Sequence, residues 1–176
     1  MQKMFRRHCI AFVLAVLAGT GLHFLYTLFP NPVSAVFSPV QESVWEHLKM
    51  LYWPYLVAAI LLTRNRQLKN AGYWGAHFAA MLVMVLIVVG GFYILSGALG
   101  VEGTAVDVAL FVIALAVAFY LSYRMYSSEA ARDCAGVLCF FVILLGAAIV
   151  LFTFLPPALP LFESRAEALG WMTIPY

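Results

Sequence analysis

Residues 41–54 read Q-E-S-V-W-E-H-L-K-M-L-Y-W-P, and they join a cluster of ionisable side chains to the beginning of an apolar segment. Glu42, Glu46, His47 and Lys49 fall within eight consecutive positions, and the chain beyond them is apolar enough to enter a lipid bilayer. Ionisable residues are costly inside a membrane span and commonly mark functional positions there. The segment therefore predicts a membrane helix that carries a polar site near one end.

The composition of the whole chain also indicates a membrane protein. Of its 176 residues, 65% are hydrophobic and only 10% are charged, whereas soluble domains are roughly 45–50% apolar and about 25% charged. The formal net charge of +2 is too small to indicate nucleic-acid binding. The apolar runs are long and lack the alternation of barrel strands, so the sequence predicts an all-α bundle of transmembrane helices.

Five apolar runs are long enough to cross a membrane, and together they predict a single transmembrane domain over residues 1–176. The predicted spans cover roughly residues 9–29, 43–62, 73–99, 104–123 and 134–155, and residues 156–176 form a tail. The first run is longer than the apolar core of a typical signal peptide, so we expect it to remain as a span.

The positions of lysine and arginine predict the orientation of the bundle. The residues before the first span, after the second span and between the fourth and fifth spans are Lys3, Arg6, Arg7, Arg64, Arg66, Lys69, Arg124 and Arg132. The other side has only Lys49 and Arg165. Because cytoplasmic loops carry an excess of positive charge, we expect the N-terminus inside and the C-terminal tail outside.

The second span offers two interpretations of its ionisable residues. At about 100° per residue, Glu42, Glu46 and Lys49 share one helix face, and Ser43 and His47 share the next. The helix dipole alone accounts for an acidic Glu42 in the first turn, and Glu46 with Lys49 forms an i,i+3 pair that neutralises both charges. Alternatively, Glu46 and His47 lie deep enough in the span to belong to a functional site.

Two other spans place ionisable residues at a similar depth. His23 lies about six residues before the outer end of the first span, and Asp107 lies near the outer start of the fourth. We expect these residues to converge with Glu46 and His47 beneath the outer surface. Two imidazoles and one or two carboxylates suit Zn²⁺ or another divalent metal, with His23, His47 and Glu46 as ligands. They suit a proton relay equally well. If a metal on His23 and His47 activates a water molecule, Glu46 or Asp107 is a candidate ligand or general base.

His77 lies near the inner end of the third span and is not expected to join that cluster. Its position is typical of an interfacial or helix-bridging histidine, or of the inner end of a proton or substrate path. His8 follows Arg7 directly and is interpreted as part of the cytoplasmic basic anchor.

Three short motifs carry a resemblance to a known family. G-L-H-F-L-Y, F-S-P-V-Q-E-S-V-W-E-H-L-K and W-P, all within residues 21–54, resemble the pattern of an uncharacterised family of small integral membrane proteins from Firmicutes-type bacteria, grouped by a domain of unknown function. Gln41, near the predicted N-cap, stands where the family pattern has Asn. The resemblance implies a multi-pass protein of the bacterial plasma membrane and implies no activity.

Three functions stay open at this point. The polar site binds a metal ion or protons, or it belongs to a membrane-embedded metal-dependent hydrolase or transferase that acts on a lipid. The third function is that of a structural or partner-binding membrane protein, in which the polar residues join the helices. Membrane lipids are the expected partners, a homo-oligomer is compatible with the sequence, and no nucleic acid is expected.

Overall fold

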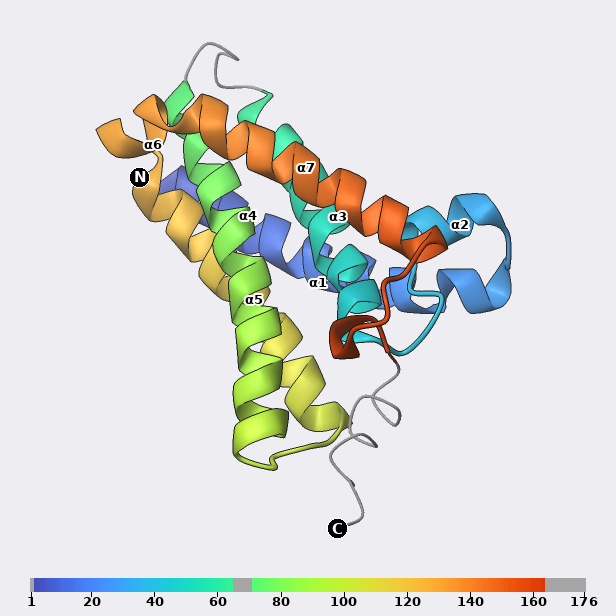
Figure 1. Ribbon diagram of the computed structural model, residues 1–176. Helices are drawn as coiled ribbons and strands as arrows, with labels where there is room; N and C mark the ends of the chain where they lie inside the picture. The colour runs from blue at the N-terminus through green and yellow to red at the C-terminus, as the bar shows by residue number, and fades with distance from the viewer. Residues whose placement is uncertain (1, 65–70, 164–176) are drawn as a thin grey trace.

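A computed structural model of the protein describes residues 2–64 and 71–163, and within these ranges every regular element is a helix (Figure 1). In chain order the elements are α1 (Gln2–Leu28), α2 (Pro32–Phe37), α3 (Val44–Thr63), α4 (Ala71–Phe92), the π-helical turn η1 (Tyr93–Ala98), α5 (Thr104–Met125), α6 (Glu129–Asp133), α7 (Ala135–Phe154) and the 3₁₀ turn η2 (Pro160–Phe162). The all-α fold predicted from the sequence is confirmed.

Within the described residues, four helices are long and apolar enough to cross a membrane: α1, α4 with its extension through η1, α5 and α7. They correspond to the first, third, fourth and fifth predicted spans. The second predicted span is α3, which is less apolar because its first turns carry Glu46, His47 and Lys49. A membrane-spanning role for α3 and the orientation of the termini stay predictions.

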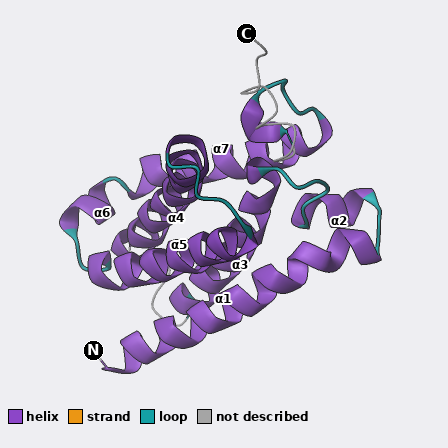
Figure 2. Cartoon of the chain, turned by 90° about the horizontal axis from the view of Figure 1, so that it is seen from below, coloured by secondary structure: helices purple, strands orange, loops and turns teal. Residues whose placement is uncertain are grey.

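Helix α3 lies in the middle of the bundle and contacts α1, α2, α4, α5 and α7. Figure 1 shows it between α7 in front and α1 behind, and Figure 2 shows α1 running along one side of the molecule to α2. Leu48, Leu51 and Tyr55 of α3 are buried in one core with Met84 of α4 and Leu115 of α5. The helix that carries Glu46, His47 and Lys49 is therefore enclosed by its neighbours.

Short helices form in two segments that the sequence leaves as turns. Helix α2 begins with a capping box in which the Asn31 side chain accepts a hydrogen bond from the Ser34 amide, and Pro32 occupies the first turn. Helix α6 is capped by Ser128, whose Oγ accepts a hydrogen bond from the Ala131 amide at 3.4 Å. These caps fix the connections at both ends of the bundle.

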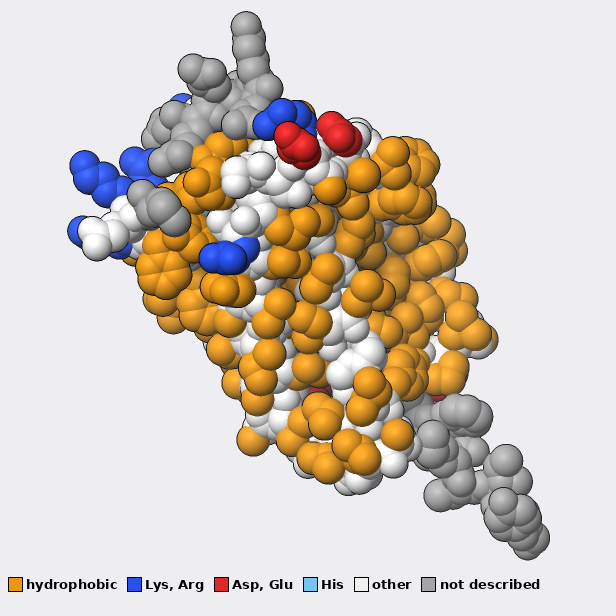
Figure 3. All heavy atoms as spheres, turned by 90° about the vertical axis from the view of Figure 1, so that its left-hand side faces the viewer, with side chains coloured by type: hydrophobic (Ala, Val, Ile, Leu, Met, Phe, Trp, Pro, Cys, Tyr) orange, Lys and Arg blue, Asp and Glu red, His pale blue; other side chains and the backbone are white. Residues whose placement is uncertain are grey.

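The outer faces of the helices expose large hydrophobic side chains. Leu17, Leu86 and Ile143 are 64%, 70% and 64% exposed. Figure 3 shows hydrophobic side chains over most of one face, with charged side chains gathered toward its upper end. Contiguous apolar surface on this scale is suited to lipid rather than to water. The molecule is therefore a membrane protein with a lipid-facing surface.

Gly75 allows α4 and α6 to approach each other closely. A Cβ atom at Gly75 would overlap the backbone carbonyl of Ala131, whereas a Cβ atom at Gly90, also in α4, would meet nothing within 4 Å. A backbone oxygen cannot rotate away, so we expect Gly75→Ala to lower the free energy of unfolding by about 1–3 kcal/mol. Gly90→Ala is expected to be neutral or stabilising. Thermal unfolding in detergent compares the two variants, and equal midpoints would contradict the tight contact.

Candidate functional site

His47 is held in a fixed orientation by the start of α3. Ser43 is the N-cap residue, because its Oγ accepts a hydrogen bond from the Glu46 amide at 3.3 Å. The sequence predicts the N-cap near Gln41, and the structure places it two residues later, at Ser43. His47 Nδ1 lies 2.7 Å from the Ser43 carbonyl oxygen. A carbonyl oxygen only accepts, so Nδ1 carries the proton and Nε2 is directed away from the helix cap.

Glu42 and His23 complete a three-residue cluster around His47. Glu42 Oε2 lies 3.2 Å from His47 Nε2, and the ring centroids of His23 and His47 are 5.4 Å apart. One ligand atom from each of the three residues lies within 4.8 Å of the other two. The structure thus brings the two histidines together, and the carboxylate beside them is that of Glu42.

The two histidines meet because α1 and α3 pack closely at Gly19. A Cβ atom at Gly19 would lie 2.5 Å from the Met50 carbonyl oxygen and 2.8 Å from Cζ of the Phe111 ring. Gly19 lies about one turn before His23, and Met50 lies about one turn after His47. Close contact between the two backbones therefore brings the two imidazoles to the same level.

One ring nitrogen of each histidine is not used by the helices that carry the two rings. Nδ1 of His47 is used by the Ser43 carbonyl oxygen, so Nε2 is the nitrogen that faces the Glu42 carboxylate. Nδ1 of His23 is buried and has no hydrogen-bond partner within the described part of the chain. Groups of this kind repel one another, or stay unsatisfied, unless a proton or a metal ion is shared among them. The arrangement favours the binding of a cation.

The cluster lies at the edge of a cavity of about 560 Å³ that α1, α3, α4 and α5 line. Its polar lining includes His23, Glu42, His47 and Asp107, and its apolar lining includes Met50, Leu51, Val88 and Phe111. The volume lies within the range of small-molecule sites. Asp107 therefore shares a cavity with the two histidines, as its depth in the sequence predicts.

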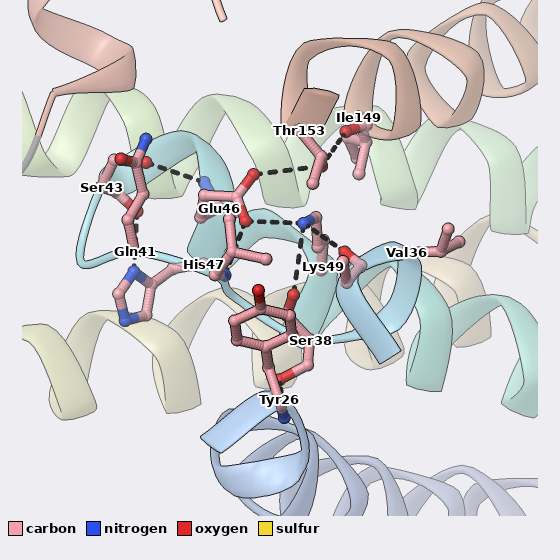
Figure 4. A network of polar contacts seen from close by, with 12 residues as sticks. Tyr26, Val36, Ser38, Gln41, Ser43, Glu46, His47, Lys49, Ile149 and Thr153 are labelled. Carbon is pink, nitrogen blue, oxygen red and sulfur yellow. Dashed lines mark hydrogen bonds and ion pairs between the residues drawn. The ribbon is translucent and has the colours of Figure 1, made fainter. Parts of the chain in front are cut away.

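Glu46 does not join the histidines, and its carboxylate is directed into a buried ion pair (Figure 4). Its Oε2 lies 2.6 Å from Lys49 Nζ and accepts a hydrogen bond from the Val40 amide at 2.8 Å. Its Oε1 accepts a hydrogen bond from the Thr153 hydroxyl of α7 at 3.1 Å. The expected convergence of Glu46 with the two histidines is therefore wrong, and the i,i+3 pair with Lys49 is confirmed.

Lys49 holds the segment that precedes α3. Besides its carboxylate partner, Nζ donates to the carbonyl oxygens of Ala35 at 2.7 Å and Ser38 at 3.2 Å, so all three of its donors are used. Ser38 is tied in turn to α1, because its Oγ accepts a hydrogen bond from the Tyr26 amide at 3.0 Å. The ion pair thus anchors the residues that lead to Glu42.

His77 lies apart from the cluster, and it is only 2% exposed. Its Nδ1 lies 3.2 Å from the Tyr55 hydroxyl, and its ring stacks on that of His8 with centroids 5.9 Å apart. His8 is itself only 6% exposed and packs between the helices, whereas the neighbouring Arg7 is exposed. These rings connect α1, α3 and α4, which is the geometry of a helix-bridging histidine rather than an interfacial one.

Gly19 and Thr153 shape the two polar clusters, although their sequence positions do not single them out. Thr153 lies 107 positions from the glutamate to which it donates. In the sequence, Thr153 is only a hydroxyl near the end of the last apolar run, and Gly19 is only a glycine one turn before His23. Neither position identifies the residue that it contacts, because both contacts depend on how distant helices pack.

The fold and the site together define an all-helical membrane protein with a buried central helix and a polar cluster beside a cavity. The model of a family of unknown function, DUF6512, matches residues 2–170, and the chain belongs to that family. This match confirms the resemblance to a family grouped by a domain of unknown function. No curated protein and no solved structure matches the chain.

Proposed function

We propose that this protein binds a divalent metal ion through His23, Glu42 and His47, beside the cavity between α1, α3, α4 and α5. The observation that carries the proposal is the grouping of one ligand atom from each residue within 4.8 Å of the others. Two imidazole nitrogens and a carboxylate oxygen are a ligand set used by Zn²⁺, at distances of about 2.0–2.2 Å. Three protein ligands leave a fourth position of the ion open toward the cavity.

The hydrogen bonds that orient the proposed ligands support the same proposal. A metal-bound histidine commonly donates its second ring N–H to a carbonyl or carboxylate, which fixes the tautomer and the ring. His47 makes this contact with the Ser43 carbonyl oxygen at 2.7 Å. The buried Lys49 holds the carbonyl oxygens of Ala35 and Ser38 in the segment that leads to Glu42. A site in which the supporting contacts already exist needs little rearrangement to bind an ion.

The proposal includes the placement of the chain in a membrane. We place α3 as a fifth span, with the N-terminus inside, the C-terminus outside and the cluster close to the outer surface of a bacterial plasma membrane. Full burial of the Glu46–Lys49 pair supports this placement, because a paired and hydrogen-bonded charge avoids most of the cost of an isolated one in lipid. The exposed hydrophobic side chains of the four longest apolar helices support it as well.

The cavity favours a second function, in which the ion serves a hydrolase or transferase that acts on a lipid. A bound divalent ion supplies an activated water or polarises a carbonyl oxygen. Asp107 lines the cavity and is the carboxylate placed to act as general base, whereas Glu46 is engaged in its ion pair. If no metal binds, the same cluster is suited to share a proton between Glu42 and His47.

Elemental analysis of detergent-purified protein tests the metal proposal. After incubation with Zn²⁺ and removal of the excess, we expect about one ion per chain in the wild type, and its loss in His23→Ala and His47→Ala. Glu102→Gln, at an exposed loop position, is the matched control and should retain the ion. A folded, monodisperse wild type without metal would overturn the proposal and leave proton sharing as the function of the cluster.

A further inference from the structure

The cavity beside the cluster has a polar end and an apolar end. His47 lies at the polar end, and Met50 and Leu51, about one turn further along α3, begin the apolar end together with Val88 and Phe111. Leu51 and Val88 are only 2% and 8% exposed, so the apolar end reaches into the core of the bundle. A cavity divided in this way is complementary to a molecule with a polar group attached to an apolar chain.

The cavity also has an apolar edge at the surface of the bundle. Phe24 of α1 and Val108 of α5 line the cavity, and each is 55% exposed. In a membrane these two side chains face the acyl chains of lipids rather than water. A ligand can therefore enter sideways from the bilayer without first leaving it, which is the route open to a lipid and closed to a water-soluble solute.

The charges around the cavity restrict the kind of lipid. Among the described residues that line it there is no lysine or arginine, whereas Glu42, Asp107 and Glu163 each contribute a carboxylate. The nearby Lys49 cannot serve an anionic ligand, because all three of its donors are used. The formal sum of these side-chain charges is negative, so the lining itself disfavours a phosphate group.

We infer that the cavity binds one acyl chain of an uncharged lipid, with an ester, amide or hydroxyl group of that lipid next to His23, Glu42 and His47. This inference rests on the proposed site for the position of the polar group. The apolar end of the cavity carries the acyl chain independently of whether an ion is bound. Acyl-chain binding and metal binding are therefore separable by experiment.

Native mass spectrometry of the detergent-purified protein with added lipid tests the inference. The probes are dioleoylglycerol and dioleoyl phosphatidic acid, which share their chains and differ in the charged phosphate. We expect the wild type to bind dioleoylglycerol at least about tenfold more tightly, because the carboxylates disfavour the anion. Equal or tighter binding of phosphatidic acid would overturn the inference.

Two substitutions examine the cavity itself. Val88→Trp fills the apolar end and should weaken dioleoylglycerol binding at least about tenfold, whereas Leu86→Trp, on the lipid-facing side of the same helix, should not change it. Val108→Trp obstructs the exposed edge and should also weaken binding. Because Val108 is 55% exposed, the larger side chain does not disturb the packing of the core. Unchanged binding in both cavity variants would overturn the inference.

Metal content is measured on the same samples. Val88→Trp and Val108→Trp should keep the ion, because neither residue is a ligand. A wild type that binds lipid but no metal contradicts only the proposed metal function. A wild type that binds metal but shows no preference for dioleoylglycerol contradicts only the lipid inference.

Discussion

Replacing Lys49 with methionine is expected to lower the free energy of unfolding by about 3–5 kcal/mol, because the Glu46 carboxylate then stays buried without its counter-ion. The two side chains are 0% and 2% exposed. The partners that remain for Glu46, the Val40 amide and the Thr153 hydroxyl, are neutral. Methionine preserves the length and apolar character of the lysine stem, so the loss reports mainly on charge. Unfolding in detergent micelles, followed by circular dichroism, measures it.

A double-mutant cycle separates the contribution of the ion pair to the free energy of unfolding from the contributions of the other contacts of Glu46 and Lys49. Glu46→Leu alone is expected to cost about as much as Lys49→Met, and the double variant should cost clearly less than the two single losses added together. It should not reach wild-type stability, because the carbonyl groups of Ala35 and Ser38 still lose their donor. Lys3→Met, at an exposed position, is the control. A loss below about 1 kcal/mol in Lys49→Met would contradict a buried pair.

The second large effect is on Zn²⁺ affinity, which should depend on Glu42 and not on the surroundings of Glu46. We expect Glu42→Gln to weaken Zn²⁺ binding at least about 100-fold, because supporting residues alone are worth 10–100-fold and Glu42 is proposed as a direct ligand. Thr153→Val removes a hydrogen bond to Glu46 and should change the Zn²⁺ affinity by less than about threefold. Competition with a chromogenic chelator measures both. Equal weakening in the two variants would contradict the assignment of Glu42 as a direct ligand.

Most of the fold could be predicted from the sequence because membrane helices are marked by long apolar runs. The runs at residues 9–29, 73–99, 104–123 and 134–155 all correspond to helices of spanning length. The helix predicted over residues 43–62 corresponds to α3, although its spanning role stays a prediction because it is not among the helices long and apolar enough to cross a membrane. The short helices α2 and α6 were not predicted, because a few capping hydrogen bonds define them.

The candidate site was predictable in part, for a different physical reason. His23, His47 and Asp107 line one cavity because residues at equal depth in packed helices come to one level. Glu42 rather than Glu46 lies beside the histidines, which was not predicted because helix geometry was applied to Glu42 as though it lay inside the helix. Ser43 is the N-cap and has an extended backbone, so the side chain before it does not follow the 100° rule.

The proposed ligands are close together in the sequence as well as in space. All three lie within residues 23–47, and Lys49 holds the same stretch through Ala35 and Ser38. During synthesis these residues leave the ribosome before α4 to α7 exist, and contacts of short sequence separation form first. We expect an ion bound at this stage to join α1 to α3 before the later helices enter the membrane. Metal supply during translation would then govern the yield of correctly inserted protein.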